Sequence, residues 1–147
     1  MGTLKQFAGK LVFVDTMPFI YHIEEHPVYV ETVEAFFVGA LRDQHYRLMT
    51  SVITLGEVLV QPYRKGDDVL VAEYEGIICG TDDLLVMPID RITSRKAARL
   101  RVDYSLKTPD ALQLASALVN GADYFLTNDK GMKKTGLSQI VLLDDLM

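Results

Sequence analysis

Four acidic residues stand at positions from which their side chains could reach a common point. These residues are Asp15, Glu57, Asp110 and Asp129. Asp15 directly follows the apolar run 11–14, and Asp129 comes shortly after a second apolar run at 124–126; both runs are typical of buried strands. Glu57 and Asp110 fall in early turns of predicted helices. All four can therefore face the carboxyl edge of a sheet, where open α/β sheets bind their ligands.

Carboxylates gathered at one point cannot all stay ionised unless a positive charge compensates for them. An oxygen-only ligand set favours a hard cation such as Mg²⁺ or Mn²⁺. The three histidines, which are His22, His26 and His45, have no metal-ligand spacing. A cation held in this way activates water and stabilises the charge of an in-line displacement. The pattern favours metal-dependent hydrolysis of a phosphodiester, without a Cys, Ser or His nucleophile.

Asp110, Asp129 and Glu57 also have ordinary structural explanations, and spacing alone leaves the choice open for these three. Asp110 suits the first turn of a helix, where its negative charge interacts favourably with the helix dipole. Asp129 belongs to an Asn-Asp pair of the kind that forms turns, and Glu57 could be a solvated helix residue. Asp123 begins a predicted strand, at the end opposite the crevice, which favours a structural role.

The order of predicted elements defines the fold class. Strands are predicted at 11–14, 46–50, 84–89, 124–126 and 140–143. Helices are predicted at 18–25, 28–45, 52 to about 62, 69–80, after Asp90 and at 109–118, with Thr16, Ser51, Asp90 and Thr108 as caps. This alternation predicts a parallel sheet covered on both faces. We find no internal repeat or linker, so residues 1–147 are predicted to form a single domain.

Composition narrows the class of protein further. The 147 residues carry a formal charge of −5, which argues against a protein that grips nucleic acid by its overall charge. The single cysteine, Cys79, excludes an internal disulfide framework and is predicted to lie in the core. No apolar run approaches the roughly 20 residues that span a bilayer, and no signal-peptide pattern is present. We therefore expect a cytoplasmic protein that does not enter membranes.

Four motifs in a fixed order make the chain similar to a known family. They are Val-Asp-Thr at 14–16, Thr-Ser-Val-Ile-Thr-Leu-Gly-Glu-Val at 50–58, Thr-Pro-Asp-Ala-Leu-Gln-Leu-Ala at 108–115 and Gly-Ala-Asp-Tyr-Phe-Leu-Thr-Asn-Asp at 121–129. Together they resemble the PIN-domain family over nearly the full length, and within it the VapC-type toxins of type II toxin–antitoxin pairs. Met17 departs from the family pattern, which frequently has Asn or Ser there.

The resemblance implies a three-layer α/β/α sandwich with a central, mainly parallel five-stranded sheet and a magnesium-dependent ribonuclease centre. Asp15 and Asp110 match the family's principal metal-binding acids, and Asp129 matches a further ligand. Glu57 matches the acid of the third helix, which could bind the metal through water. Thr127 matches the hydroxyl residue that orients the acids. Thr16, and more weakly Asp123, match supporting positions. Such toxins usually dimerise and bind an antitoxin whose tail covers the active site.

Basic residues on both sides of Asp110 and after Asp129 could hold RNA phosphates. We name Arg95, Arg99, Lys107 and Lys130 as candidates, although each could equally be part of a solvated face. The alternative to a toxin ribonuclease is a non-catalytic PIN fold that binds protein or RNA. A haloacid-dehalogenase-like phosphatase fits less well because Met17 stands where it needs a second Asp. A phospho-receiver fits less well because Asp144-Asp145, not Lys, follows the last strand.

Overall fold

The computed structural model describes residues 2–147 and has one five-stranded sheet at its centre. The strands are β1 (Leu11–Val14), β2 (Arg47–Ser51), β3 (Leu84–Met87), β4 (Tyr124–Thr127) and β5 (Ile140–Leu142). Their order across the sheet is β3-β2-β1-β4-β5, and every neighbouring pair is parallel. All five carboxyl ends therefore meet at one edge, with β1 in the middle of that edge.

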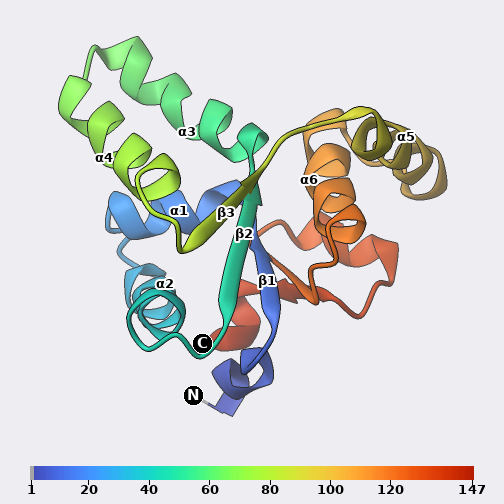
Figure 1. The fold of residues 1–147 in the computed structure, drawn as a ribbon, viewed down its shortest axis with the longest axis horizontal. Helices are drawn as coiled ribbons and strands as arrows, with labels where there is room; N and C mark the ends of the chain where they lie inside the picture. The colour runs from blue at the N-terminus through green and yellow to red at the C-terminus, as the bar shows by residue number, and fades with distance from the viewer. Residues whose placement is uncertain (1) are drawn as a thin grey trace.

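Helices cover both faces of this sheet. They are α1 (Thr16–Ile23), α2 (Val30–Phe37), α3 (Val52–Lys65), α4 (Asp68–Cys79), α5 (Arg91–Tyr104) and α6 (Thr108–Val119), joined by the short helices η1 (Gly2–Phe7), η2 (Val38–Arg42), η3 (Lys130–Thr135) and η4 (Leu143–Leu146). Figure 1 shows α1 to α4 on one side of the sheet, and α5 with α6 on the other. This arrangement confirms the predicted three-layer α/β/α sandwich.

The central strand explains why two separate cores form. Val12 and Val14 face the core beneath α1 to α4, while Leu11 and Phe13 face the core beneath α5 and α6. Each of these residues is buried, as the uninterrupted apolar run of a parallel strand requires. On the α6 side, the rings of Phe13 and Phe125 stack across the β1–β4 pair at 5.3 Å. The middle of the sheet is thus a firm base for residues at its carboxyl edge.

Several predicted helix boundaries were wrong by a few residues. Asp15, not Thr16, is the N-cap of α1, and Lys107, not Thr108, precedes α6. The predicted helix at 28–45 is shorter, because α2 gives way to the wider turns of η2. Helix α3 passes through Pro62 and ends at Lys65, since the proline removes only one helical hydrogen bond near the end and Gly66 closes the helix at φ +63°.

The prediction that Cys79 lies in the core was also wrong. Cys79 is the last residue of α4 and is exposed, whereas its neighbour Ile78 is fully buried. A three-residue apolar stretch on a helix cannot bury every member, because successive residues point about 100° apart. Within residues 2–147, no helix is long and apolar enough to cross a membrane.

Candidate active site

Asp15 stands where β1 passes into α1, at the carboxyl edge of the sheet. Its N–H donates to the carbonyl of Leu126 at 2.9 Å, which extends the β1–β4 pairing by one residue. The side chain then turns back to cap α1, and Oδ1 accepts the N–H of Thr16 at 2.8 Å. Asp15 is therefore held from both directions by backbone groups.

Three donors surround the Asp15 carboxylate. Oδ1 accepts the Thr16 N–H and, at 3.3 Å, the amide of Gln113 from α6. Oδ2 accepts the hydroxyl of Thr127, the last residue of β4, at 2.8 Å. A carboxylate offers about four lone-pair positions, so Oδ2 keeps capacity for one further positive partner.

Glu57 approaches the same edge from α3. Its Oε1 accepts the hydroxyl of Thr16 at 2.5 Å, and the two residues are 41 positions apart in the chain. Thr54, three residues earlier on the same face of α3, lies 3.4 Å from the Thr16 hydroxyl. Thr16 thus links the two acids, because its hydroxyl bonds Glu57 and its N–H bonds Asp15.

Asp110 and Gln113 are three residues apart and share one face of α6. Burial raises the pKa of the Asp110 carboxyl, and the negative charges of Asp129 and Asp15 raise it further. Lys107 and Lys134 act in the opposite direction but do not cancel these effects. Asp110 therefore lies within electrostatic reach of two of the other acids.

Asp129 is held beside Thr127 by the turn that follows β4. Its N–H donates to the Thr127 hydroxyl at 3.0 Å, and its Oδ1 accepts the N–H of Gly131 at 2.8 Å. A Cβ at position 131 would lie 3.0 Å from that Oδ1, so glycine gives the carboxylate room. One hydroxyl, that of Thr127, thereby positions both Asp15 and Asp129.

The electrostatics of Asp15 match this crowding. Burial raises the pKa of its carboxyl most, the bonds from Thr127 and Thr16 lower it, and the Glu57 charge raises it again. Charge repulsion therefore connects Asp15 with Glu57 and with Asp110, and it connects Asp110 with Asp129. This is the arrangement for which a cation offers the simplest compensation.

The side chains as placed define no metal site, although the chemical type of the donors suits a cation. Within residues 2–147, no group of three or more His, Cys, Asp or Glu side chains could hold a metal ion as placed. Glu57 and Asp129 are hydrogen-bonded to Thr16 and Gly131 instead. The donor set still suits a hard cation, since it consists of carboxylate oxygens and Asp15 Oδ2 retains a free position.

Asp123 lies apart from this group, because its hydrogen bonds are with Leu11. Its Oδ2 accepts the N–H of Leu11 at 2.8 Å, and its own N–H donates to the Leu11 carbonyl. Both contacts lie at the start of β1 and β4, which is the amino edge of the sheet. Asp123 fastens these two strands together, as expected for an acid that begins a strand.

The basic candidates are exposed and differ in their partners. Arg95 and Arg99 project from α5, where Arg99 lies 4.0 Å from Asp103. Lys107 is close enough to lower the pKa of Asp110. Lys130 lies 3.6 Å from Asp144 near the C-terminus. Lys107 is the one most directly tied to the acids.

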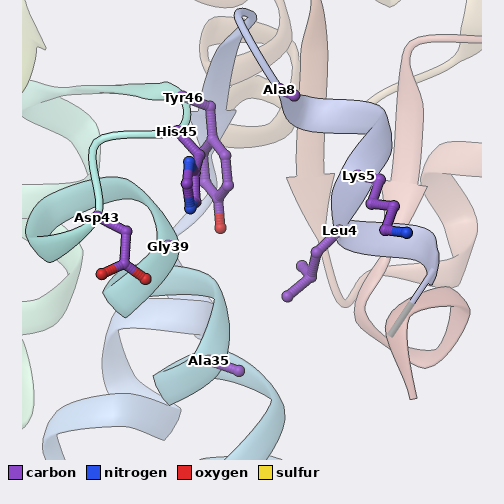
Figure 2. Close-up of a pocket in the computed structure, with 8 residues that line it drawn as sticks. All are labelled: Leu4, Lys5, Ala8, Ala35, Gly39, Asp43, His45 and Tyr46. Atoms are coloured by element: carbon purple, nitrogen blue, oxygen red, sulfur yellow. The ribbon is translucent and has the colours of Figure 1, made fainter.

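A separate pocket opens at the opposite edge of the sheet. It has a volume of about 360 Å³ and lies between η1 and the α2–η2 segment. Figure 2 shows the Leu4 side chain of η1 extending towards the side that carries Gly39, His45 and Tyr46, whereas the Lys5 side chain points away from them. His45 and Tyr46 immediately precede β2, so this pocket lies at the amino ends of the strands, away from Asp15.

Sequence reasoning missed the polar residues beneath the acids. Gln113, Ser51 and Thr54 are fully buried and hydrogen-bonded to one another. The available signal was Gln113 itself, an amide in an otherwise apolar stretch of α6, three residues after Asp110. Buried amides need partners, so its position pointed to a polar interior at this edge.

Comparison with known proteins agrees with this geometry. The family model for the PIN domain matches residues 12–137, and the chain belongs to the PIN-domain family. A search of curated proteins gave no significant match.

Solved structures with the same fold include bacterial toxins. A toxin–antitoxin complex from Klebsiella pneumoniae is 20% identical, with 90% of this chain and 97% of that chain covered and a TM-score of 0.66. VapC20 of Mycobacterium tuberculosis, a toxin that cleaves the sarcin–ricin loop, is 17% identical with 87% and 97% covered and a TM-score of 0.70. VapBC2 of Rickettsia felis, bound to a promoter DNA fragment, is 15% identical with 90% and 96% covered and a TM-score of 0.68. The chain thus shares the fold of VapC-type toxins.

Proposed function

We propose that this protein is a divalent-metal-dependent endoribonuclease and the toxin of a toxin–antitoxin pair. The observation that carries the proposal is the series of carboxylates at the carboxyl edge in which Glu57 repels Asp15, Asp15 repels Asp110, and Asp110 repels Asp129. Membership of the PIN-domain family and the fold shared with a toxin that cleaves the sarcin–ricin loop support it.

Each acid has a distinct part in this proposal. Asp15, Asp110 and Asp129 would hold Mg²⁺ or Mn²⁺, and Glu57 would reach it through water. A bound cation would supply an activated water and stabilise charge on the phosphate under attack. Thr127 keeps Asp15 and Asp129 together, and Thr16 joins Glu57 to them. The protein thus contributes orientation, and Lys107 offsets part of the negative charge where RNA enters.

The basic helix α5 suits RNA phosphates. It carries five basic residues and one acidic residue, in a chain whose overall charge is −5. Because Arg95 and Arg99 are exposed on it, we propose that they bind the RNA backbone, together with Lys107 and Lys130. Such contacts position a substrate without reading its sequence.

The test compares matched variants on RNA. We expect Asp15→Asn and Asp110→Asn to abolish cleavage, because each removes a metal-binding charge. Asp82→Asn should keep wild-type activity, because Asp82 is exposed and precedes β3 at the amino edge. Cleavage ends are mapped after incubation with Mn²⁺, with and without chelator. Full activity of purified Asp15→Asn would refute the mechanism, and an inactive wild-type protein that binds RNA would favour the non-catalytic PIN fold.

Two protein partners belong to the proposal. One is a cognate antitoxin, supported by the complexes that share this fold, and co-purification with the product of the neighbouring open reading frame tests it. The other is a second copy of the chain. Val52, Gly56 and Val60 form an exposed stripe on α3 beside a groove shared with α6. We expect Val60→Glu to yield monomers in light scattering, and an unchanged mass would contradict this surface.

A further inference from the structure

The residue that ties the three acid-bearing elements together is Gln113. It lies on α6 and is 1% exposed. Its side chain is hydrogen-bonded to Asp15 after β1, to Thr54 of α3 and to Ser51, the N-cap of α3. We propose that Gln113 is a positioning residue, which fixes the Asp15 carboxylate relative to the helix that carries Glu57. Its consequence for catalysis rests on the ribonuclease proposed above.

The orientation of the Gln113 amide follows from its neighbour Ser51. The Ser51 hydroxyl oxygen accepts the N–H of Ile53 as the cap of α3, so its proton is free to be donated. That proton goes to Gln113 Oε1 at 2.5 Å. The amide oxygen therefore faces Ser51, and the amide NH₂ group must face the opposite way.

The NH₂ group then has two acceptors. It donates to the Thr54 hydroxyl at 2.7 Å and to Asp15 Oδ1 at 3.3 Å, with the Thr16 hydroxyl 3.4 Å away. Within residues 2–147, no buried side-chain nitrogen or oxygen lacks a partner. A fully satisfied buried amide of this kind has one preferred orientation.

The chain of contacts has a direct effect on the acids. Thr54 is fully buried and is flanked by the hydroxyls of Thr50 and Thr16; Thr16 in turn bonds Glu57. Gln113 therefore connects Asp15 with the Thr54 and Thr16 hydroxyls that hold Glu57. It does so without touching the open side of Asp15 Oδ2, so it sets geometry and leaves that position free.

The test is Gln113→Met, which keeps the length of the side chain and removes the amide. We expect Mn²⁺ affinity to fall about 10–100-fold, as for other outer-shell partners of metal ligands. The kcat should fall while KM stays unchanged, because Gln113 does not face the substrate. Gln113→Asn is the second variant, since its shorter amide cannot reach both Ser51 and Asp15.

The matched control is Tyr46→Phe, which removes a buried hydroxyl bonded to the Phe36 carbonyl at 2.5 Å, on the opposite edge. It should lower the melting temperature without changing Mn²⁺ affinity or kcat. A merely structural role for Gln113 predicts the same pattern for Gln113→Met, and that result would overturn the inference.

A crystal structure of metal-free Gln113→Met separates this inference from the proposed function. We expect the Asp15 carboxylate to lose its 2.8 Å bond to Thr127 or its 2.8 Å bond to the Thr16 N–H. If Asp15 keeps both bonds, the inference fails, whatever the activity. If instead wild-type protein binds no Mn²⁺ and cuts no RNA, the ribonuclease proposal fails, and the position of Asp15 still decides the role of Gln113.

Discussion

Replacing Thr127 with valine removes one hydroxyl group and keeps the shape of the side chain. Thr127 is fully buried at the end of β4. Its hydroxyl donates to Asp15 Oδ2 at 2.8 Å and accepts the Asp129 N–H at 3.0 Å. Thr127→Val therefore deprives one acid of a donor and loosens the turn that carries the other.

The size of the effect follows from the charge on Asp15. A hydrogen bond to an ionised group contributes about 1.5–3 kcal/mol to stability. For a domain of this size, 1 kcal/mol shifts Tm by roughly 2–4 °C. We therefore expect Thr127→Val to lower the Tm of the metal-free protein by about 3–12 °C at neutral pH.

The loss of stability should depend on pH in a defined direction. Burial raises the pKa of Asp15 above its ordinary value of 3.8, and the Thr127 bond lowers it. Without that bond the folded-state pKa rises further, while the unfolded-state pKa is unchanged. Below the ordinary value, Asp15 is protonated in every state and only a neutral bond is lost, about 1 kcal/mol. As pH rises through both folded-state pKa values, the loss grows to its full size.

The control is Thr135→Val, because Thr135 makes the same pair of bonds with neutral groups. Its hydroxyl donates to the Met132 carbonyl at 3.0 Å and accepts the Leu137 N–H at 3.2 Å. We expect a smaller loss of stability that does not vary with pH, and unchanged RNA cleavage. Thermal melts from acid to neutral pH, together with cleavage rates, make the comparison. Equal, pH-independent losses in the two variants would refute the reasoning.

Three further predictions concern the acids, the metal and the core. Asp15→Asn should raise the Tm of the metal-free protein at neutral pH. The pKa of Asp15 is raised in the folded state, so the stability that Asp15 contributes is present below pH 3.8 and is lost as the pH rises through the folded-state pKa. Asparagine has no charge to bury, and a lower Tm would contradict this. Mn²⁺ at about 100 times its Kd should stabilise wild type by roughly 2.7 kcal/mol, and an equal gain in Asp15→Asn would exclude that residue as a ligand. Gly39→Ala should destabilise by about 1–3 kcal/mol, since its Cβ would lie 2.6 Å from the Tyr46 hydroxyl oxygen, and should leave the specific activity of folded protein unchanged; wild-type stability would contradict it.

The order of elements was predictable because each strand carries its own signal. An apolar run such as 11–14 can be recognised without its neighbours, and a strand buried on both faces needs such a run. The boundaries depended on neighbouring residues that a rule about one residue leaves out. Pro62 lies inside α3, which ends three residues later at Lys65 with Gly66 as its C-cap, and a rule about proline alone does not include that stop signal.

The acids were also predictable in their place along the elements, because strand ends and early helix turns place them. Their supporting residues were harder to predict, since Gln113 gains its partners from elements 59 and 98 positions away. No local pattern relates an amide on α6 to a hydroxyl on α3. Asp123 shows the reverse case, in which a family motif suggested a site residue but its place at the start of β4 put it at the other edge.

The arrangement of donors indicates how the fold tolerates such a site. Thr16, Gln113 and Thr127 provide three donors to Asp15, yet burial and Glu57 still leave the pKa of Asp15 above its ordinary value. The hydrogen bonds therefore offset only part of the combined effect of burial and of the Glu57 charge, and the repulsion from Glu57 persists. The firm β1–β4 pairing below, with Phe13 stacked on Phe125, holds the acids together against that repulsion. The repulsion among the acids already destabilises the folded, metal-free protein, and a bound cation would remove that repulsion. The residues that lower the stability of the metal-free protein should therefore increase the affinity of the site for the metal.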